Sequence, residues 1–124
     1  MAQNGGSMAQ GDHDRRIDYI EFGATDIGTT KQFYQRVFGW TFEDYGPDYT
    51  SFQDGRLSGG FTKDAKVRPA NPLVVIYAAR LEETEGKITQ AGGKIVRKTY
   101  SFPGGRRFHF KDPSGNELAV WSDK

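Results

Sequence analysis

Residues 17–40 read IDYIEFGATDIGTTKQFYQRVFGW, and this stretch decides how the chain is expected to fold. Its first residues, 17–22, alternate apolar and polar side chains, and a period of two is typical of a half-buried strand. Asp26 or Thr25 is suited to begin a helix, because a short side-chain oxygen can accept a hydrogen bond from the free amides of the first turn. Gly39 is suited to end it, because glycine readily adopts the left-handed conformation found after a helix. The stretch predicts a strand followed by a helix.

The elements predicted downstream of this helix repeat the same order. Three short strands follow at residues 40–44, 49–53 and 57–62, and Asp54-Gly55 is a strong hairpin signal between the last two. A linker at 68–72 contains two prolines. The second copy then comprises a strand at 73–78, a helix from about 81 to 91 that ends at Gly92-Gly93, and strands at 94–99, 106–111 and 117–122.

The spacing of helix boundaries supports a duplication. Asp26 and Gly39 are 13 residues apart, and so are Arg80 and Gly93. We therefore predict an α+β fold: two βαβββ repeats forming an eight-stranded curved sheet, or cup, with helices on the convex face and a cleft on the concave face. A two-layer α+β sandwich with a filled interior is the alternative. In the predicted domain, residues 17–124, repeat one spans 17–67 and repeat two 73–122.

Composition narrows the classes of function. The chain has 124 residues, with 17 Lys and Arg against 16 Asp and Glu, and a formal charge of +1 creates no long-range attraction to nucleic acid or anionic membranes. The absence of cysteine excludes disulfides, thiolate zinc sites and cysteine nucleophiles, and fits a cytoplasmic protein. No signal-peptide pattern or membrane-length apolar run is recognised. Residues 1–16 are mostly polar or glycine and have no apolar periodicity, so a disordered N-terminal tail is expected.

Three motifs carry a family resemblance: FYQRVFGW at 33–40, AGGK at 91–94, and DPSGN at 112–116 with the strand that follows it. Together they resemble the vicinal oxygen chelate superfamily, the glyoxalase, bleomycin-resistance and dioxygenase group. The likeness covers almost all of residues 17–121. It indicates a fold more specifically than a function, because the superfamily holds both metalloenzymes and antibiotic-sequestering proteins. Short members commonly pair, so the resemblance also implies a homodimer.

The resemblance places four metal ligands, usually His or Glu, on the first and last strands of each repeat. By the family's spacing they correspond here to Tyr19, Leu73, Ala119 and either Gly59 or Gly60. None of these residues is a strong ligand for Mg²⁺, Mn²⁺ or Zn²⁺. The usual metal site is therefore predicted to be missing, and neither a cofactor nor a catalytic residue is assigned.

Strand alternation then predicts which side chains line the cleft. If Tyr19 faces inward, its neighbours on the same face of the sheet give the candidate ligand-binding residues Tyr19, Glu21, Tyr77, Arg107, His109 and Trp121. Aromatic rings with a few charged groups suit a flat or amphipathic organic molecule, bound by stacking and directional contacts.

Each candidate also has a structural interpretation. His109 is also typical of a hydrogen-bonded histidine exposed at the rim of a sheet. Glu21 and Arg107 would form a structural ion pair, and Trp121 would anchor a dimer interface. The glycine-rich segment 102–105 indicates a bend or a mobile lip. Arg106 and Arg107 beside it would attract an anionic group, or else form a solvated pair.

Three functions remain open. The favoured one is a metal-independent small-molecule-binding protein of the glyoxalase/bleomycin-resistance type, which takes an aromatic or amphipathic ligand. The alternative is a divalent-metal lyase, isomerase or dioxygenase with a displaced metal site. The third is a dimeric accessory protein without a ligand. Partners are expected to be a small organic molecule and a second copy of the chain, with no nucleic acid and no membrane.

Overall fold

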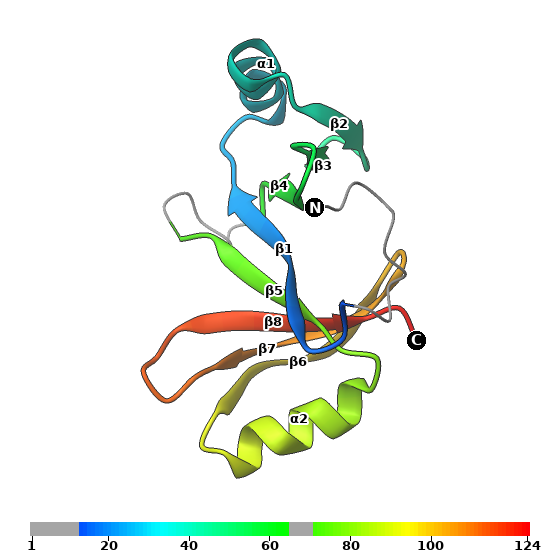
Figure 1. Cartoon of the computed structure of the whole chain (residues 1–124). Helices are drawn as coiled ribbons and strands as arrows, with labels where there is room; N and C mark the ends of the chain where they lie inside the picture. The colour runs from blue at the N-terminus through cyan, green and yellow to red at the C-terminus, as the bar shows by residue number, and fades with distance from the viewer. Residues whose placement is uncertain (1–12, 65–70) are drawn as a thin grey trace. The chain divides into compact units, whose positions relative to one another are not determined.

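The computed structural model describes residues 13–64 and 71–124. They form two compact units, one of Tyr19–Leu73 and one of Val74–Lys124 together with residues 13–18, and each unit holds most of one repeat. Each contains four strands and one helix in the order βαβββ (Figure 1). The predicted α+β fold of two βαβββ repeats is therefore confirmed. Within the described ranges, neither helix is long and apolar enough to cross a membrane.

Repeat one is a four-stranded sheet with a single helix. Its elements are β1 (Arg16–Gly23), α1 (Ile27–Phe38), β2 (Thr41–Asp44), β3 (Tyr49–Gln53) and β4 (Ser58–Thr62). The strand order is β2-β3-β4-β1, with β1 parallel to β4 and the other pairs antiparallel. The predicted cap of α1 is confirmed, because the Asp26 carboxylate accepts from the Thr29 amide at 3.1 Å. Gly39 ends the helix with φ of 73°.

Aromatic rings fill the space between α1 and its sheet. Tyr34 and Trp40 stack with centroids 4.6 Å apart, and Trp40 stacks on Phe52 at the same distance. Phe22 and Phe61, from the two parallel strands, stack beside them at 5.4 Å. This core determines which face of the sheet meets the helix, so alternate residues of β1, β3 and β4 are turned to the opposite face.

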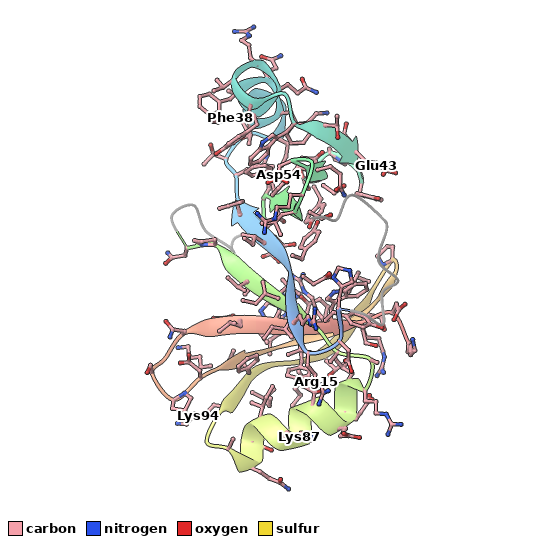
Figure 2. The ribbon with its side chains drawn as sticks, viewed as in Figure 1. Arg15, Phe38, Glu43, Asp54, Lys87 and Lys94 are labelled. Carbon is pink, nitrogen blue, oxygen red and sulfur yellow. The ribbon has the colours of Figure 1, made fainter. Side chains whose placement is uncertain are left out.

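Repeat two has the same topology. Its elements are β5 (Leu73–Tyr77), α2 (Leu81–Gln90), β6 (Lys94–Phe102), β7 (Gly105–Lys111) and β8 (Glu117–Ser122). The order is β5-β8-β7-β6, with β5 parallel to β8. The correspondence with repeat one, down to its single parallel pair, supports the duplication. Figure 2 shows Asp54 at the turn that leads from β3 and Lys94 at the start of β6.

An aliphatic and aromatic core joins α2 to this second sheet. Leu81, Phe108, Phe110 and Val120 are its main buried members, and Ile88 packs against them. Phe108, Phe110 and Val120 lie on the helix side, as the alternation predicted. The residues between them, such as His109, are therefore turned to the face away from α2.

The long hairpin of repeat two differs from the prediction. β6 continues to Phe102, which pairs with Gly105 at the start of β7, and Gly104 between them has φ of 109°. The segment 102–105 is thus a tight two-residue turn, as expected of a bend and unlike a mobile lip. Proline with a following glycine suits such a turn, because glycine takes positive φ without steric cost.

The start of the described chain belongs to repeat two. The Arg15 amide donates to the Tyr77 carbonyl at 2.7 Å, and the Asp14 carboxylate accepts from the Ala79 amide at 2.8 Å. Residues 1–12 of the predicted tail, and 65–70 of the linker region, lie outside the described residues. These hydrogen bonds connect residues 14 and 15, which the prediction assigned to the tail, to repeat two.

Two glycines should respond oppositely to alanine substitution. Gly86 lies inside α2 with nothing within 4 Å of an added Cβ, so Gly86→Ala should raise the free energy of unfolding by about 0.5–1 kcal/mol. Gly39 has equal room but positive φ, so Gly39→Ala should lower it by about 1 kcal/mol. Urea unfolding followed by circular dichroism measures both. A loss of stability in Gly86→Ala would contradict the interpretation of that position.

Candidate functional site

The predicted site residues fall into two groups, one in each repeat. Tyr19 and Glu21 lie on β1 of repeat one. Tyr77 on β5, Arg107 and His109 on β7, and Trp121 on β8 lie in repeat two. Both groups occupy the sheet face that alternates with the helix-side core, and each group is connected by contacts of its own.

In repeat one, two phenols and a carboxylate form a hydrogen-bonded chain. The Tyr49 hydroxyl donates to the Glu21 carboxylate at 2.8 Å and lies 2.6 Å from the Tyr19 hydroxyl. Since Tyr49 has one hydroxyl proton and gives it to Glu21, Tyr19 is the donor in the second bond. Glu21 is only 3% exposed. Burial, and then the neighbouring carboxylate, raise the pKa of Tyr49, so this phenol keeps its proton.

Tyr49 was not among the predicted site residues. Its strand was predicted correctly, but the faces of that strand were not assigned. The sequence did contain a signal for its orientation. Phe52 is an evident core residue on the same strand, and because side chains alternate, a residue three positions earlier points to the opposite face.

Gly60 makes room for the two phenols. A Cβ on Gly60 would lie 2.2 Å from the Tyr49 hydroxyl and 2.6 Å from the Tyr19 hydroxyl, whereas one on Gly59 would meet the Phe52 ring at 2.4 Å. Of the two positions left open for a ligand in repeat one, Gly60 therefore shares the face of Tyr19. The phenol oxygens occupy the space that a side chain at Gly60 would need.

The metal implied by the family does not fit the residues at these positions. Leu73 and Ala119 are hydrocarbon side chains that are 4% and 0% exposed, and Gly60 has no side chain at all. Tyr19 already donates to a second phenol. Across residues 13–64 and 71–124, no group of three or more His, Asp or Glu side chains is placed to hold a metal ion. The chemistry of this donor set offers a cation no anchoring ligand.

In repeat two, a second hydrogen-bonded chain passes through His109. The Arg107 Nε donates to the Tyr100 hydroxyl, which lies 2.9 Å from His109 Nε2. His109 Nδ1 lies 3.2 Å from a Glu117 carboxylate oxygen. A carboxylate only accepts, so Nδ1 carries the imidazole hydrogen and Nε2 accepts from Tyr100. His109 is 2% exposed, so the alternative of a histidine exposed at the rim is wrong.

The electrostatics around His109 keep its imidazole neutral. Burial lowers its pKa, the positive charges of Arg107 and Arg97 lower it further, and Glu117 opposes them. The bond to Glu117 is therefore a hydrogen bond from a neutral ring, and Tyr100 stays the donor to Nε2 at neutral pH.

A bulged strand brings Tyr100 into this chain. Along β6, the pairing with β7 shifts between Ile95 and Arg97 and again between Arg97 and Tyr100. Each shift inserts one extra residue, so Arg97 and Tyr100 share a face although they are three residues apart. The prediction missed Tyr100 because it ended this strand at residue 99.

Aromatic side chains continue this face of repeat two. The rings of Tyr77 and Trp121 meet edge to face at 5.2 Å, and Phe102 lies 6.2 Å from Trp121. The Trp121 indole donates to Asp18 at 3.0 Å. Tyr77 donates to Asp123 at 2.6 Å, and burial together with this carboxylate raises the pKa of Tyr77 to about 12. Tyr77 is fully buried and supports Trp121, while Trp121 and Phe102 are half-buried.

Gly60→Ala should destabilise the tyrosine chain of repeat one. Its Cβ would displace the Tyr49 hydroxyl from Glu21, and a buried carboxylate that loses a donor costs about 1–3 kcal/mol. Chemical denaturation measures the loss. In a double-mutant cycle, Gly60→Ala combined with Tyr49→Ala should lose less stability than the two single variants lose together, because Tyr49→Ala removes the ring that the new Cβ would meet. Strict additivity would show that Gly60 and Tyr49 do not meet.

The buried imidazole should make stability pH-dependent. The pKa of His109 is lower in the folded than in the unfolded chain, so below about pH 6.5 the unfolded chain binds more protons. The free energy of unfolding should then decrease as the pH is lowered below this value, by at most about 1.4 kcal/mol per pH unit. His109→Gln preserves a donor and an acceptor and should flatten the profile between pH 6.5 and 5. Identical profiles for the wild-type and His109→Gln proteins would refute the assignment.

Comparison with known proteins identifies the family. The model of the Glyoxalase/Bleomycin resistance protein/Dioxygenase superfamily matches residues 16–120. Anthracycline biosynthesis protein DauV of Streptomyces sp. (strain C5) is 27% identical over 83% of this chain, and DnrV of Streptomyces peucetius is 27% identical over the same share. The chain spans 45% of the length of each.

Solved structures agree in fold. The Mn(II)-bound glyoxalase from Novosphingobium aromaticivorans superposes with a TM-score of 0.65 and 21% identity, over 90% of this chain and 40% of the other. The hypothetical protein BH1468 from Bacillus halodurans C-125 gives a TM-score of 0.69 at 13% identity, over 88% and 94% of the two chains. With the family model covering most of its length, this chain belongs to the Glyoxalase/Bleomycin resistance protein/Dioxygenase superfamily.

Proposed function

We propose that this chain is a metal-independent small-molecule-binding protein that takes an aromatic or amphipathic organic ligand. The observation that carries the proposal is the face of repeat two on which half-buried Trp121 and Phe102 adjoin the Arg107–Tyr100 pair. Flat hydrocarbon surface beside oriented donors is the combination used to stack and align a planar ligand.

The residues at the family's usual metal positions are chemically unsuited to bind a metal ion. They carry glycine, leucine, alanine and a phenol that is already hydrogen-bonded, so substrate oxygens would have no cation to chelate there. Affinity would come instead from the burial of ligand surface, at about 25 cal/mol per Å². In repeat two, His109 and Tyr77 have little exposed surface and would position their neighbours, leaving Arg107 and Trp121 to meet the ligand.

The curated relatives support an aromatic ligand. Both are named as anthracycline biosynthesis proteins, and anthracyclines are fused-ring aromatic compounds. A fused-ring molecule matches the flat side chains of repeat two in shape and polarity. At 27% identity over part of their length, these relatives suggest the class of ligand. The probes below are chosen from that class.

We also propose a homodimer as the working form. The proposal follows from the family resemblance, because members of this group commonly pair. Light scattering after size exclusion distinguishes a dimer from a monomer.

Binding of 2-naphthamide, a neutral fused-ring probe, tests the proposed function. At 100 times its dissociation constant the probe should stabilise the folded chain by about 2.7 kcal/mol, seen as a rise in melting temperature. Trp121→Leu should weaken binding at least tenfold. Phe33→Leu, which removes an aromatic ring that is 53% exposed on α1, should leave it unchanged.

Two outcomes would favour the other functions. Stoichiometric Mn, Fe, Ni or Zn in protein purified without chelator would support a metalloenzyme with a displaced site. No thermal shift with naphthamide or larger fused-ring compounds, and no metal, would support an accessory protein without a ligand.

A further inference from the structure

One hydrogen atom sets the direction of the hydrogen-bonded chain through His109. The Tyr100 hydroxyl donates its single hydrogen to His109 Nε2 at 2.9 Å, which leaves its oxygen to accept from Arg107 Nε. On the other side of the ring, His109 Nδ1 donates to Glu117 at 3.2 Å. The bond from Arg107 to Tyr100 therefore depends on where the Tyr100 hydrogen points.

A proton added to His109 would reverse its bond with Tyr100. Nδ1 already carries a hydrogen, so the new proton goes to Nε2, which then donates to the Tyr100 oxygen instead of accepting from it. Tyr100 must turn its own hydrogen away from His109. A phenol oxygen is conjugated with its ring, which keeps the hydrogen near the ring plane and leaves it one other position. That position is the lone pair that accepts from Arg107, so two donors would meet there.

The charges around His109 act in the same direction. Among the described residues, the titratable and charged groups that act on this ring come from the adjoining strands of its sheet: Arg97 and Tyr100 of β6, Arg107 of β7 and Glu117 of β8. A positive imidazole would be repelled by both guanidinium groups and attracted by Glu117. Repulsion weakens the Arg107 end of the chain and attraction strengthens the Glu117 end, so the chain opens at Arg107.

The bond at stake lies at one end of the aromatic surface of repeat two. The guanidinium carbon of Arg107 is 5.6 Å from the centroid of the Tyr100 ring and 5.9 Å from that of Phe102. Phe102 in turn lies 6.2 Å from Trp121. A planar donor group that is no longer oriented by Tyr100 changes the polar end of this face.

We infer that repeat two contains a pH-sensitive switch, in which protonation of His109 breaks the bond from Arg107 to Tyr100 and reorients the Arg107 side chain. Burial, together with the two arginines, lowers the pKa of His109, so the switch operates on the acid side of the ordinary histidine value. The switch itself needs no ligand. Its effect on a ligand rests on the proposed function, because it changes the face assigned to that ligand.

Hydrogen exchange of the arginine Nε–H groups, followed by NMR, tests the switch. Spectra are recorded from pH 7.5 down to the lowest pH at which circular dichroism shows a folded chain. Exchange of the Arg107 Nε–H with water should accelerate by about tenfold or more, because a hydrogen bond from a charged group is worth at least this factor. The midpoint should match that of the His109 ring protons. Exchange of an unbonded guanidinium N–H slows in acid, so acceleration reports the loss of the bond.

Arg106 provides a control within the same spectra. Its Nε donates to the Lys124 carbonyl at 3.0 Å, and a carbonyl does not titrate in this range. The Arg106 Nε–H should therefore stay protected through the titration of His109. Acceleration at Arg106 with the same midpoint as at Arg107 would show a general loosening in acid and would overturn the switch.

Two variants assign the effect to the chain through His109. His109→Gln keeps an acceptor for Tyr100 and a donor for Glu117 but does not titrate, so the Arg107 Nε–H should stay protected in acid. Tyr100→Phe removes the oxygen that Arg107 binds, so this N–H should be less protected at neutral pH and should not respond to His109. Circular dichroism checks that both variants fold.

Three further results would overturn the switch. The first is an Arg107 Nε–H that stays protected after His109 has titrated. The second is a His109 that stays neutral until acid unfolds the chain, because the switch would then never operate. The third is equal acceleration in His109→Gln and in the wild-type chain.

The effect on a ligand is measured separately. The dissociation constant of 2-naphthamide should rise below the midpoint in the wild-type chain and stay constant in His109→Gln, since only the wild type loses the orientation of Arg107. Equal affinity on both sides of the midpoint would overturn this effect. A probe that binds at no pH would overturn the proposed function, and the exchange measurements would still decide the switch.

Discussion

The packing of each helix on its own sheet is the constraint on which the remaining structure depends. In repeat one the rings of Tyr34, Trp40 and Phe52 stack between α1 and the strands, and in repeat two Leu81 and Phe108 do the same for α2. Because side chains alternate along a strand, burying one face against a helix leaves every other residue on the opposite face. A slip of one residue would exchange the faces and expose the core, so the polar clusters are held in place by hydrophobic packing elsewhere.

The two repeats share a topology but place different chemistry on the face away from the helix. Repeat one has an acidic cluster, where two phenols are ordered by buried Glu21 and the absence of a side chain at Gly60 gives them room. Repeat two has a basic cluster around Tyr100, with a neutral histidine beneath it. Such differences follow from single side chains, so two units of one topology carry separate polar networks.

Buried polar groups in both clusters are satisfied through ordered chains of donors and acceptors. Each chain has one consistent direction: Tyr19 to Tyr49 to Glu21 in repeat one, and Arg107 to Tyr100 to His109 to Glu117 in repeat two. A buried polar group without a partner is costly, so completing these chains stabilises one arrangement of side chains over others. The chains therefore fix the orientation of Arg107 and Tyr100.

The sequence alone was sufficient for the order of elements, the caps of α1 and the faces of β1, β5, β7 and β8. These features depend on near neighbours: Asp26 caps an amide three residues away, and the position of Phe108 on the helix side determines that of His109. The tertiary structure decided which distant side chains meet. Tyr49 joins Glu21 through the packing of β3 beside β4 and β1, and Tyr100 reaches His109 only because β6 is bulged against β7. Local periodicity does not encode pairing between separate strands, because an extra residue in one strand reverses the face of all that follow it.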